Sequence, residues 1–313
     1  MEHDAYVVGV DGGGSKTQMT LFQTKPTGLL VVAESEGKSS NATVEDFAKI
    51  ATDLERQLGQ LCGEQEVQLE QLTALGLGMA GAGRPSVSDA WQDWACHRFP
   101  NLQVWVGSDL DLVLPDAQDG KPTVVLLAGT GTIAALRDVS GELHRIGGWG
   151  PILGDEGSGY WMAIQAFKAV CQALDRGDEP SPLWHEAQAF LEVESWREAP
   201  AVIRRLTRSE IASFAGVVIR CSREGDPEAR KIVQRTLSHW LEMLEGLGAR
   251  VGTGPIHLRL AGGLIVGHDD LLQQLVSQLS ERVSWPEFAL EVFEEATRVA
   301  AIKALQQGSK ADG

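Results

Sequence analysis

The segment Tyr6-Val-Val-Gly-Val-Asp-Gly-Gly-Gly-Ser-Lys-Thr17 decides how this sequence folds. Its apolar run at residues 6–11 is typical of a buried β-strand, and three consecutive glycines end that strand. Because glycine adopts backbone conformations closed to other residues, the turn can bring backbone N–H groups close to an anion. Asp11, at the end of the strand, can hold a hydrated Mg²⁺, and Ser15 or Thr17 can donate a hydroxyl. The alternative is an ordinary glycine hairpin. The segment is not a Walker A loop, because Ser15 occupies the position where that loop needs lysine.

The same pattern occurs a second time, at Leu127-Ala-Gly-Thr-Gly-Thr132. There the apolar strand 123–128 runs into a turn of glycine and threonine, and further strands are expected at 131–137 and 142–147. The first half has matching strands at 17–23 and 28–35. One such hairpin is weak evidence, but two of them, each opening one half of the chain, predict two related α/β domains. Their loops would face each other across a cleft and hold one polyphosphate.

The domain boundary is expected at residues 118–122, the most polar and turn-rich point between the halves, which gives domains 1–119 and 120–313. A helical stretch at about 177–250 reads as an insertion in the second domain. A helix at roughly 44–61 has apolar positions at helical spacing, and Asn41 or Thr43 can cap it.

Composition narrows the class of protein. The 313 residues carry 27 Lys+Arg against 43 Asp+Glu, so the net charge is −16, which argues against nucleic acid or an anionic membrane as the main partner. The four cysteines are widely spaced, and no signal peptide or 18-residue apolar run is visible, so we expect a soluble cytoplasmic protein. The segment Gly76–Gly81 matches the dinucleotide fingerprint, but no acidic residue ends the next strand about 20 residues on, so we do not expect nicotinamide binding.

A carboxylate follows the predicted strand 102–107. Asp109 would lie at the carboxyl edge of a parallel sheet, where ligands bind, and could take the proton of a substrate hydroxyl that attacks phosphorus. The alternative is that Asp109 caps a helix that begins at residue 110. Asp111 competes with it for either role.

Two further glycine-rich segments are candidate ligand loops. Residues 147–159 (Gly-Gly-Trp-Gly-Pro-Ile-Leu-Gly-Asp-Glu-Gly-Ser-Gly) combine rigid turns, an aromatic plane and two acids, which suits a polyol. The alternative is a capped helix start, with Asp155 or Ser158 as the cap. Residues 260–264 place Gly262 and Gly263 after a strand and before a helix, where adenine or ribose could lie against the backbone.

Together these motifs resemble the sugar kinase/heat-shock-70/actin ATPase superfamily. Within it they are similar to the BadF/BadG/BcrA/BcrD-type group, which contains N-acetylglucosamine kinase and bacterial glucosamine kinase. Residues 11–17 match the first phosphate motif, 128–132 the second and 260–264 the adenosine motif, while Gly148–Ser158 matches the amino-sugar loop. One departure is Thr132, where human-type members have serine. Another is that no cysteine pattern fits the iron–sulfur site of the activator ATPases in the group.

The resemblance implies two actin-like, ribonuclease H-like domains around a cleft, and an ATP-dependent kinase that phosphorylates the 6-hydroxyl of N-acetylglucosamine or glucosamine. Asp109 would be the catalytic base, and Asp11 would hold Mg²⁺ through water. The implied sugar contacts are Asn41, Asp109, Gly148, Trp149, Gly150 and Asp155. The implied ATP contacts are Gly13, Gly14, Ser15, Lys16, Thr17, Gly129, Thr130, Gly131, Gly262 and Gly263.

Several alternatives stay open at this point. One is an ATPase that acts on a protein partner, and another is a non-catalytic sugar sensor. The residues do not decide between the amino and the acetamido sugar, or whether Asp111 shares the role of Asp109. A homodimer is compatible with the resemblance, because related kinases are often dimers.

Overall fold

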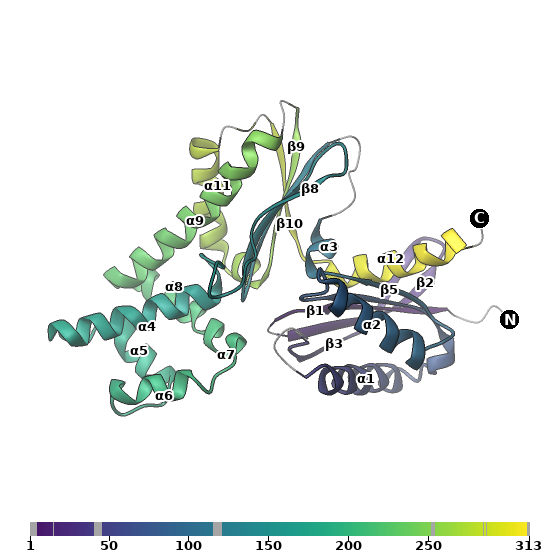
Figure 1. The fold of residues 1–313 in the computed structure, drawn as a ribbon, viewed down its shortest axis with the longest axis horizontal. Helices are drawn as coiled ribbons and strands as arrows, with labels where there is room; N and C mark the ends of the chain where they lie inside the picture. Colours follow the sequence, from purple (N-terminus) through teal and green to yellow (C-terminus); the bar gives the residue numbers. More distant parts are fainter. Residues whose placement is uncertain are drawn as a thin grey trace. The chain divides into compact units, whose positions relative to one another are not determined.

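The computed structural model describes residues 5–14, 16–40, 46–114, 121–251, 254–283, 285 and 287–311. Two compact units make up the chain (Figure 1). Unit 1 consists of Met1–Val113 and Glu295–Gly313, and unit 2 consists of Leu114–Glu294. Each unit has its own sheet and its own apolar core, so each is described by itself.

Unit 1 is built on a five-stranded sheet in the order β3-β2-β1-β4-β5. Its strands are β1 (Tyr6–Gly12), β2 (Lys16–Lys25), β3 (Gly28–Lys38), β4 (Leu72–Met79) and β5 (Gln103–Gly107). Its helices are α1 (Phe47–Glu64), η1 (Leu69–Gln71), α2 (Pro85–Arg98), α3 (Asp109–Val113) and α12 (Ala296–Ala311). Strand β1 is antiparallel to β2 and parallel to β4, so the carboxyl ends of β1, β4 and β5 lie at one edge.

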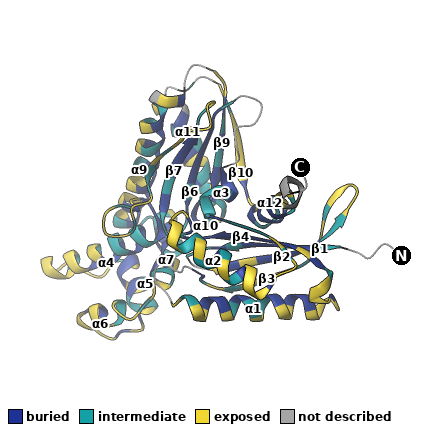
Figure 2. Ribbon diagram, turned by 45° about the vertical axis from the view of Figure 1, so that its right-hand side comes forward, coloured by how far each residue is buried: buried dark blue, intermediate teal, exposed yellow. Residues whose placement is uncertain are grey.

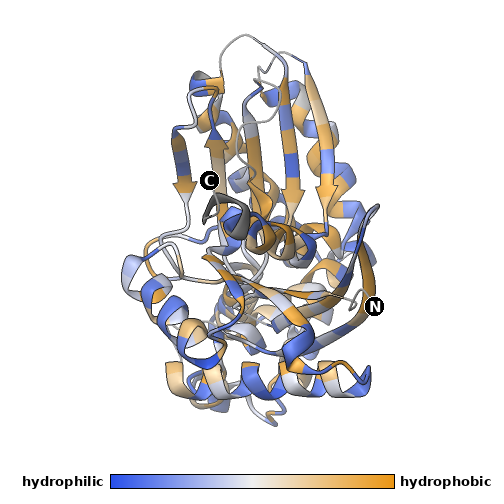
Figure 3. Cartoon of the chain, turned by 90° about the vertical axis from the view of Figure 1, so that its right-hand side faces the viewer, coloured by the Kyte–Doolittle hydropathy of each residue, from blue (hydrophilic) through white to orange (hydrophobic). Residues whose placement is uncertain are grey.

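The period-2 pattern of β1 divides its side chains between two cores. Val8 and Val10 face the apolar cluster that α1 and α2 complete, whereas Val7 faces α12. Helices therefore cover both faces of this sheet, with α1 and α12 on opposite sides (Figure 1). In Figure 3 hydrophobic and polar residues alternate along many of the strands as well as along the helices.

Helix α12 is where the structure departs from the predicted domain 120–313, because this C-terminal helix packs in unit 1. Two glycines make room for it. Gly9 of β1 and Gly76 of β4 are register partners. A Cβ at Gly9 would lie 1.8 Å from the backbone oxygen of Thr297 in α12, and a Cβ at Gly76 would lie 2.0 Å from that of Ala300. Gly76, which opens the dinucleotide-like sequence pattern, thus serves helix–sheet packing.

Unit 2 repeats the architecture of unit 1 with the strand order β8-β7-β6-β9-β10. Its strands are β6 (Thr123–Ala128), β7 (Thr132–Arg137), β8 (Leu143–Gly147), β9 (Ile256–Ala261) and β10 (Phe288–Phe293). Read from the antiparallel edge, both sheets place their strands in the order third, second, first, fourth, fifth. This shared topology confirms the prediction of two related α/β domains. Figure 2 shows central strands of each sheet, such as β4, β6 and β7, as buried.

A block of helices interrupts the second unit between β8 and β9, as the sequence predicts. They are α4 (Gly159–Arg176), α5 (Pro182–Phe190), η2 (Trp196–Glu198), α6 (Ala199–Ile203), α7 (Arg208–Ser213), α8 (Ala215–Glu224) and α9 (Pro227–Val251). The short α10 (Gly263–Val266) and α11 (Asp269–Arg282) follow β9. One continuous apolar core joins this helical block to β6, β7 and β9.

The start of one helix differs from the sequence prediction. Helix α1 begins at Phe47, and its cap is Asp46, whose carboxylate accepts hydrogen bonds from the backbone N–H groups of Ala48 and Lys49. The predicted caps Asn41 and Thr43 lie outside the described residues.

Within the described residues, no helix is long and apolar enough to cross a membrane.

Candidate active site

The first glycine turn of unit 1 is a tight hairpin between β1 and β2. The backbone N–H of Gly13 donates to the carbonyl of Lys16 at 2.9 Å, and the Gly13 carbonyl accepts from Ser40 at 3.3 Å. A Cβ at Gly12 would lie 2.5 Å from the Ser40 hydroxyl, so this position needs glycine. Ser15, predicted to serve ATP, lies outside the described residues, as does the predicted sugar contact Asn41.

Two polar side chains of this turn bond to other residues of unit 1. Thr17 is buried, and its hydroxyl lies 2.6 Å from the Lys38 carbonyl and 2.8 Å from the Ser40 hydroxyl. The ammonium group of Lys16 pairs with Glu36 at 2.6 Å. In this structure the Thr17 hydroxyl therefore links β2 to the end of β3, and Gly13 and Gly14 form the half-buried backbone of the turn.

Two carboxylates meet at the carboxyl edge of the first sheet. Asp11 lies near the end of β1, and Asp109 begins α3 directly after β5. Burial, together with repulsion from Asp109, raises the pKa of Asp11 to about 7, while Lys16 lowers it. Burial also raises the pKa of Asp109, and Asp111 adds to that rise. Such a pair of hard oxygen donors lacks sufficient positive charge, so a divalent cation such as Mg²⁺ fits it chemically.

The structure separates the two acids that compete after β5. Asp111 forms a reciprocal cap with Ser108: its carboxylate accepts from the Ser108 backbone N–H at 2.8 Å and from the Ser108 hydroxyl at 2.7 Å, and its own N–H donates back to that hydroxyl at 3.2 Å. Asp109 accepts from the adjacent Leu110 N–H at 3.0 Å and from its own backbone N–H, which is not a capping geometry. Capping thus occupies Asp111 and leaves Asp109 able to accept a proton.

The second glycine turn, in unit 2, is tied to the start of α4. Gly129 donates its N–H to the Gly131 carbonyl at 2.9 Å, and its own carbonyl accepts from Gly159 at 2.8 Å. Gly262 adopts a φ of +93°, and a Cβ there would lie 2.3 Å from the Ala128 carbonyl oxygen. The two loops that the sequence predicts for phosphate and adenosine, 129–131 and 262–263, are therefore packed side by side at the ends of β6 and β9.

The predicted sugar loop follows β8 and presents an open aromatic face. Gly148 and Gly150 flank Trp149 with φ values of +69° and +87°, conformations that favour glycine. Trp149 is 62% exposed, and the guanidinium of Arg145 lies over its ring at 4.8 Å. A planar ring held in this way, with much of its surface open to solvent, suits stacking against the apolar face of a sugar.

Asp155 ends this loop in a buried position. It is only 5% exposed and has a φ of +61°, and Ser158 rather than Asp155 caps α4 by accepting a hydrogen bond from Trp161. Its carboxylate pairs with Arg208 of α7 at 2.8 Å. Sequence reasoning missed Arg208, because no local motif links a residue of the helical block to a loop 53 positions earlier.

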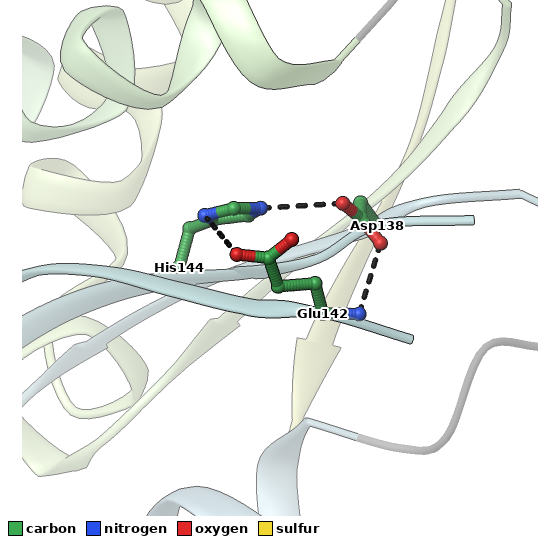
Figure 4. A group of neighbouring side chains, drawn as sticks. All are labelled: Asp138, Glu142 and His144. Carbon is green, nitrogen blue, oxygen red and sulfur yellow. Dashed lines mark hydrogen bonds and ion pairs between the residues drawn. The ribbon is translucent and has the colours of Figure 1, made fainter. Parts of the chain in front are cut away.

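A separate acidic and histidine cluster lies on the hairpin of β7 and β8 (Figure 4). His144 Nε2 lies 3.2 Å from Asp138 Oδ2, and its Nδ1 lies 3.9 Å from Glu142 Oε1. One ligand atom of each of the three side chains lies within 4.8 Å of the others, an arrangement that exposed acidic groups often have without an ion. Asp138 also accepts from Ser140 and from the Glu142 N–H, and these bonds lower its pKa to about 2. The cluster therefore serves the turn of this hairpin.

Comparison with known proteins places this chain in a family. Residues 8–287 match the family described as the BadF/BadG/BcrA/BcrD ATPase family. The chain belongs to this ATPase family. A relative named N-acetylmuramic acid/N-acetylglucosamine kinase, from Clostridium acetobutylicum, is 32% identical over 231 residues, 73% of this chain and 74% of that protein. An N-acetyl-D-glucosamine kinase of Dictyostelium discoideum is 28% identical over 54% of this chain and 55% of its own length.

Solved structures show that the fold of this BadF/BadG/BcrA/BcrD member is shared. A candidate N-acetylglucosamine kinase from Chromobacterium violaceum has a TM-score of 0.76 at 24% identity, and covers 96% of this chain and 99% of its own. A ROK family glucokinase from Streptomyces griseus, solved with glucose and AMPPNP, has a TM-score of 0.60 at 14% identity, with 96% and 100% coverage. These similarities confirm the predicted fold class of actin-like ATPase domains.

Proposed function

We propose that this chain is an ATP-dependent kinase that phosphorylates the 6-hydroxyl of an amino sugar, N-acetylglucosamine or glucosamine. The proposal rests on the contacts of the two acids that follow β5. Asp111 caps the helix, whereas Asp109 keeps a carboxylate that can accept a proton. The kinase names of the two relatives support the same reaction class.

In this mechanism Asp109 orients the sugar hydroxyl and takes its proton while the oxygen attacks the γ-phosphorus of ATP. Burial raises the pKa of Asp109, which makes it a stronger base than an exposed carboxylate. The Leu110 N–H holds one oxygen of Asp109 and so fixes the direction of the other. ADP leaves as the phosphoryl group passes to the sugar, and the proton stays on Asp109 until release.

The remaining residues have binding roles. Backbone N–H groups of the 12–14 and 129–131 turns are proposed to contact the phosphates, and Gly262 and Gly263 the adenosine. Trp149 would stack on the sugar ring, and Gly148, Gly150 and Asp155 would bond to its hydroxyls. Asp11 is the acid proposed to hold Mg²⁺ through water; when bound, the ion offsets charge on the β- and γ-phosphates.

The test is ADP release from purified protein, with and without a panel of glucosamine, N-acetylglucosamine, N-acetylmuramic acid and glucose. ADP release that depends on an amino sugar supports the proposal. Turnover that is equal without any sugar identifies an ATPase that serves another partner, and sugar binding without turnover identifies a sensor. Light scattering on the same sample tests whether the chain forms a homodimer.

A further inference from the structure

Arg208 of α7 reaches the sugar loop from the helical block. Its Nη2 donates to Asp155 Oδ2 at 2.8 Å, and Asp155 is buried while the Arg208 side chain is 28% exposed. Arg208 is the first residue of α7, and the preceding Thr207 forms a capping box with Glu210. The guanidinium also lies over the ring of Tyr160, 5.6 Å from its centre, in the first turn of α4. The direction of the Arg208 side chain is thus fixed from two elements.

Three features reduce the stability that the Asp155–Arg208 pair can contribute. Asp155 adopts a left-handed backbone conformation, which is uncommon for residues other than glycine and is typical of strained functional positions. Its carboxylate is desolvated, and buried ion pairs often contribute little net stability. The Arg208 Nε is buried, and no acceptor for it lies among the described residues. Stability alone therefore does not account for this arrangement.

The surroundings of Asp155 hold its carboxylate in one orientation. The Thr132 N–H approaches Oδ1 at 3.5 Å, and Arg208 holds Oδ2. A Cβ at Gly131 would lie 3.3 Å from the same carboxylate, so the acid lies directly beneath the second glycine turn. Asp155 is thus tied both to the phosphate turn and to the helical block.

We propose that Arg208 is a positioning residue for the sugar, which holds the Asp155 carboxylate in the orientation that accepts hydrogen bonds from sugar hydroxyls. This inference rests on the proposed function and deepens it, because it assigns a residue of the helical block to sugar recognition. Because Arg208 acts through Asp155, its loss is expected to weaken sugar binding more than ATP binding.

The charges around Asp155 predict that the affinity for the sugar depends on pH. Burial raises the pKa of Asp155, and Arg208 opposes that rise, as do the backbone N–H groups of Thr132 and Gly150. Arg208 is the charged group among those that shift this pKa. Without Arg208 the pKa of Asp155 rises further, so the ionised carboxylate is lost at a higher pH as the solution is acidified. Sugar affinity should then fall over a pH range in which the unaltered protein still binds.

The experiment compares the unaltered protein with Arg208→Gln, Arg208→Lys and the control Arg205→Gln. Arg205 is an exposed arginine three positions earlier, so its substitution removes the same charge from the same segment. For each protein, KM for N-acetylglucosamine, KM for ATP and kcat are measured from pH 6 to 8, and calorimetry gives the sugar Kd without turnover. Circular dichroism melting verifies the fold.

Arg208→Gln is expected to raise the sugar KM and Kd about tenfold at neutral pH, the scale of one hydrogen bond to a charged group, and to raise them more at pH 6. Arg208→Lys should restore the pH dependence in part, and Arg205→Gln should match the unaltered protein. In an Asp155→Asn background, Arg208→Gln should add little. Sugar affinity and pH dependence unchanged in Arg208→Gln would overturn the inference. Absence of amino-sugar turnover in the unaltered protein would instead overturn the proposed function.

Discussion

The substitution Asp109→Asn tests the proposed chemistry most sharply, because the structure shows what it changes. Asparagine keeps the size of the side chain, and its carbonyl oxygen can still accept the Leu110 N–H bond of 3.0 Å. The cap of α3 belongs to Ser108 and Asp111, so it is untouched. The change therefore removes a proton acceptor from the site and leaves the local fold intact.

Loss of a general base typically lowers the rate by a factor of about 10² to 10⁴, or about 2.7 to 5.5 kcal/mol of transition-state stabilisation. We expect kcat to fall by about 10² or more, with a sugar Kd within about threefold of the original because the hydroxyl can still bond to an amide. Asp109 also raises the pKa of Asp11 by repulsion, so its neutralisation should move the acidic limb of the pH–rate profile to lower pH.

The assay is coupled ADP release at saturating ATP with varied sugar, together with calorimetric sugar binding. Asp111→Asn is the matched control: the same isosteric change two residues away should lower Tm through the weakened cap and leave kcat within a fewfold of the original. Near-normal turnover in Asp109→Asn would refute the role of Asp109 as base. Equal losses of kcat in the two variants would refute the separation of roles inferred from the Ser108 cap.

Three further predictions follow from other residues. Because burial raises the pKa of Asp11 to about 7, protons should compete with Mg²⁺, so the Mg²⁺ concentration for half-maximal rate should be higher at pH 6 than at pH 8. An Asp11→Asn variant should lose this pH dependence. If the variant keeps it, the dependence arises from another group. Gly262→Ala should lower Tm and raise KM for ATP, since its Cβ would lie 2.3 Å from the Ala128 carbonyl at a φ of +93°, and an unchanged Tm would contradict the strain. Trp149→Ala should leave Tm nearly unchanged, because the ring is 62% exposed, but weaken sugar binding by about 1 kcal/mol, roughly fivefold; equal affinity would remove Trp149 from the sugar site.

Local patterns in the sequence predict the strands and glycine turns well, because both depend on neighbouring residues. The apolar run before Asp11 and the glycines after it specify a strand and a tight turn, and the second copy at 123–132 does the same. The repeated strand order of the two sheets follows from this repetition.

Features that depend on long-range packing are not predictable in the same way. The packing of α12 in unit 1 depends on Gly9 and Gly76, which are register partners. In the sequence Gly9 lies in an apolar run and Gly76 opens a dinucleotide-like pattern, and neither context indicates a helix packed against them. The choice between Asp109 and Asp111 depends on the direction of the Ser108 side chain. Arg208 meets Asp155 only through the fold of the helical block, so the spacing of the two residues carries no signal.

The position of the phosphate on the reaction product tests the proposed kinase activity directly. Purified protein is incubated with ATP, Mg²⁺ and N-acetylglucosamine, in parallel with glucosamine, and the sugar is analysed by proton–phosphorus correlation NMR. ATP consumption should be matched by sugar that carries a phosphate on the 6-oxygen, and Asp109→Asn should yield almost none. Inorganic phosphate with unmodified sugar, or phosphate on another oxygen, would contradict the proposal.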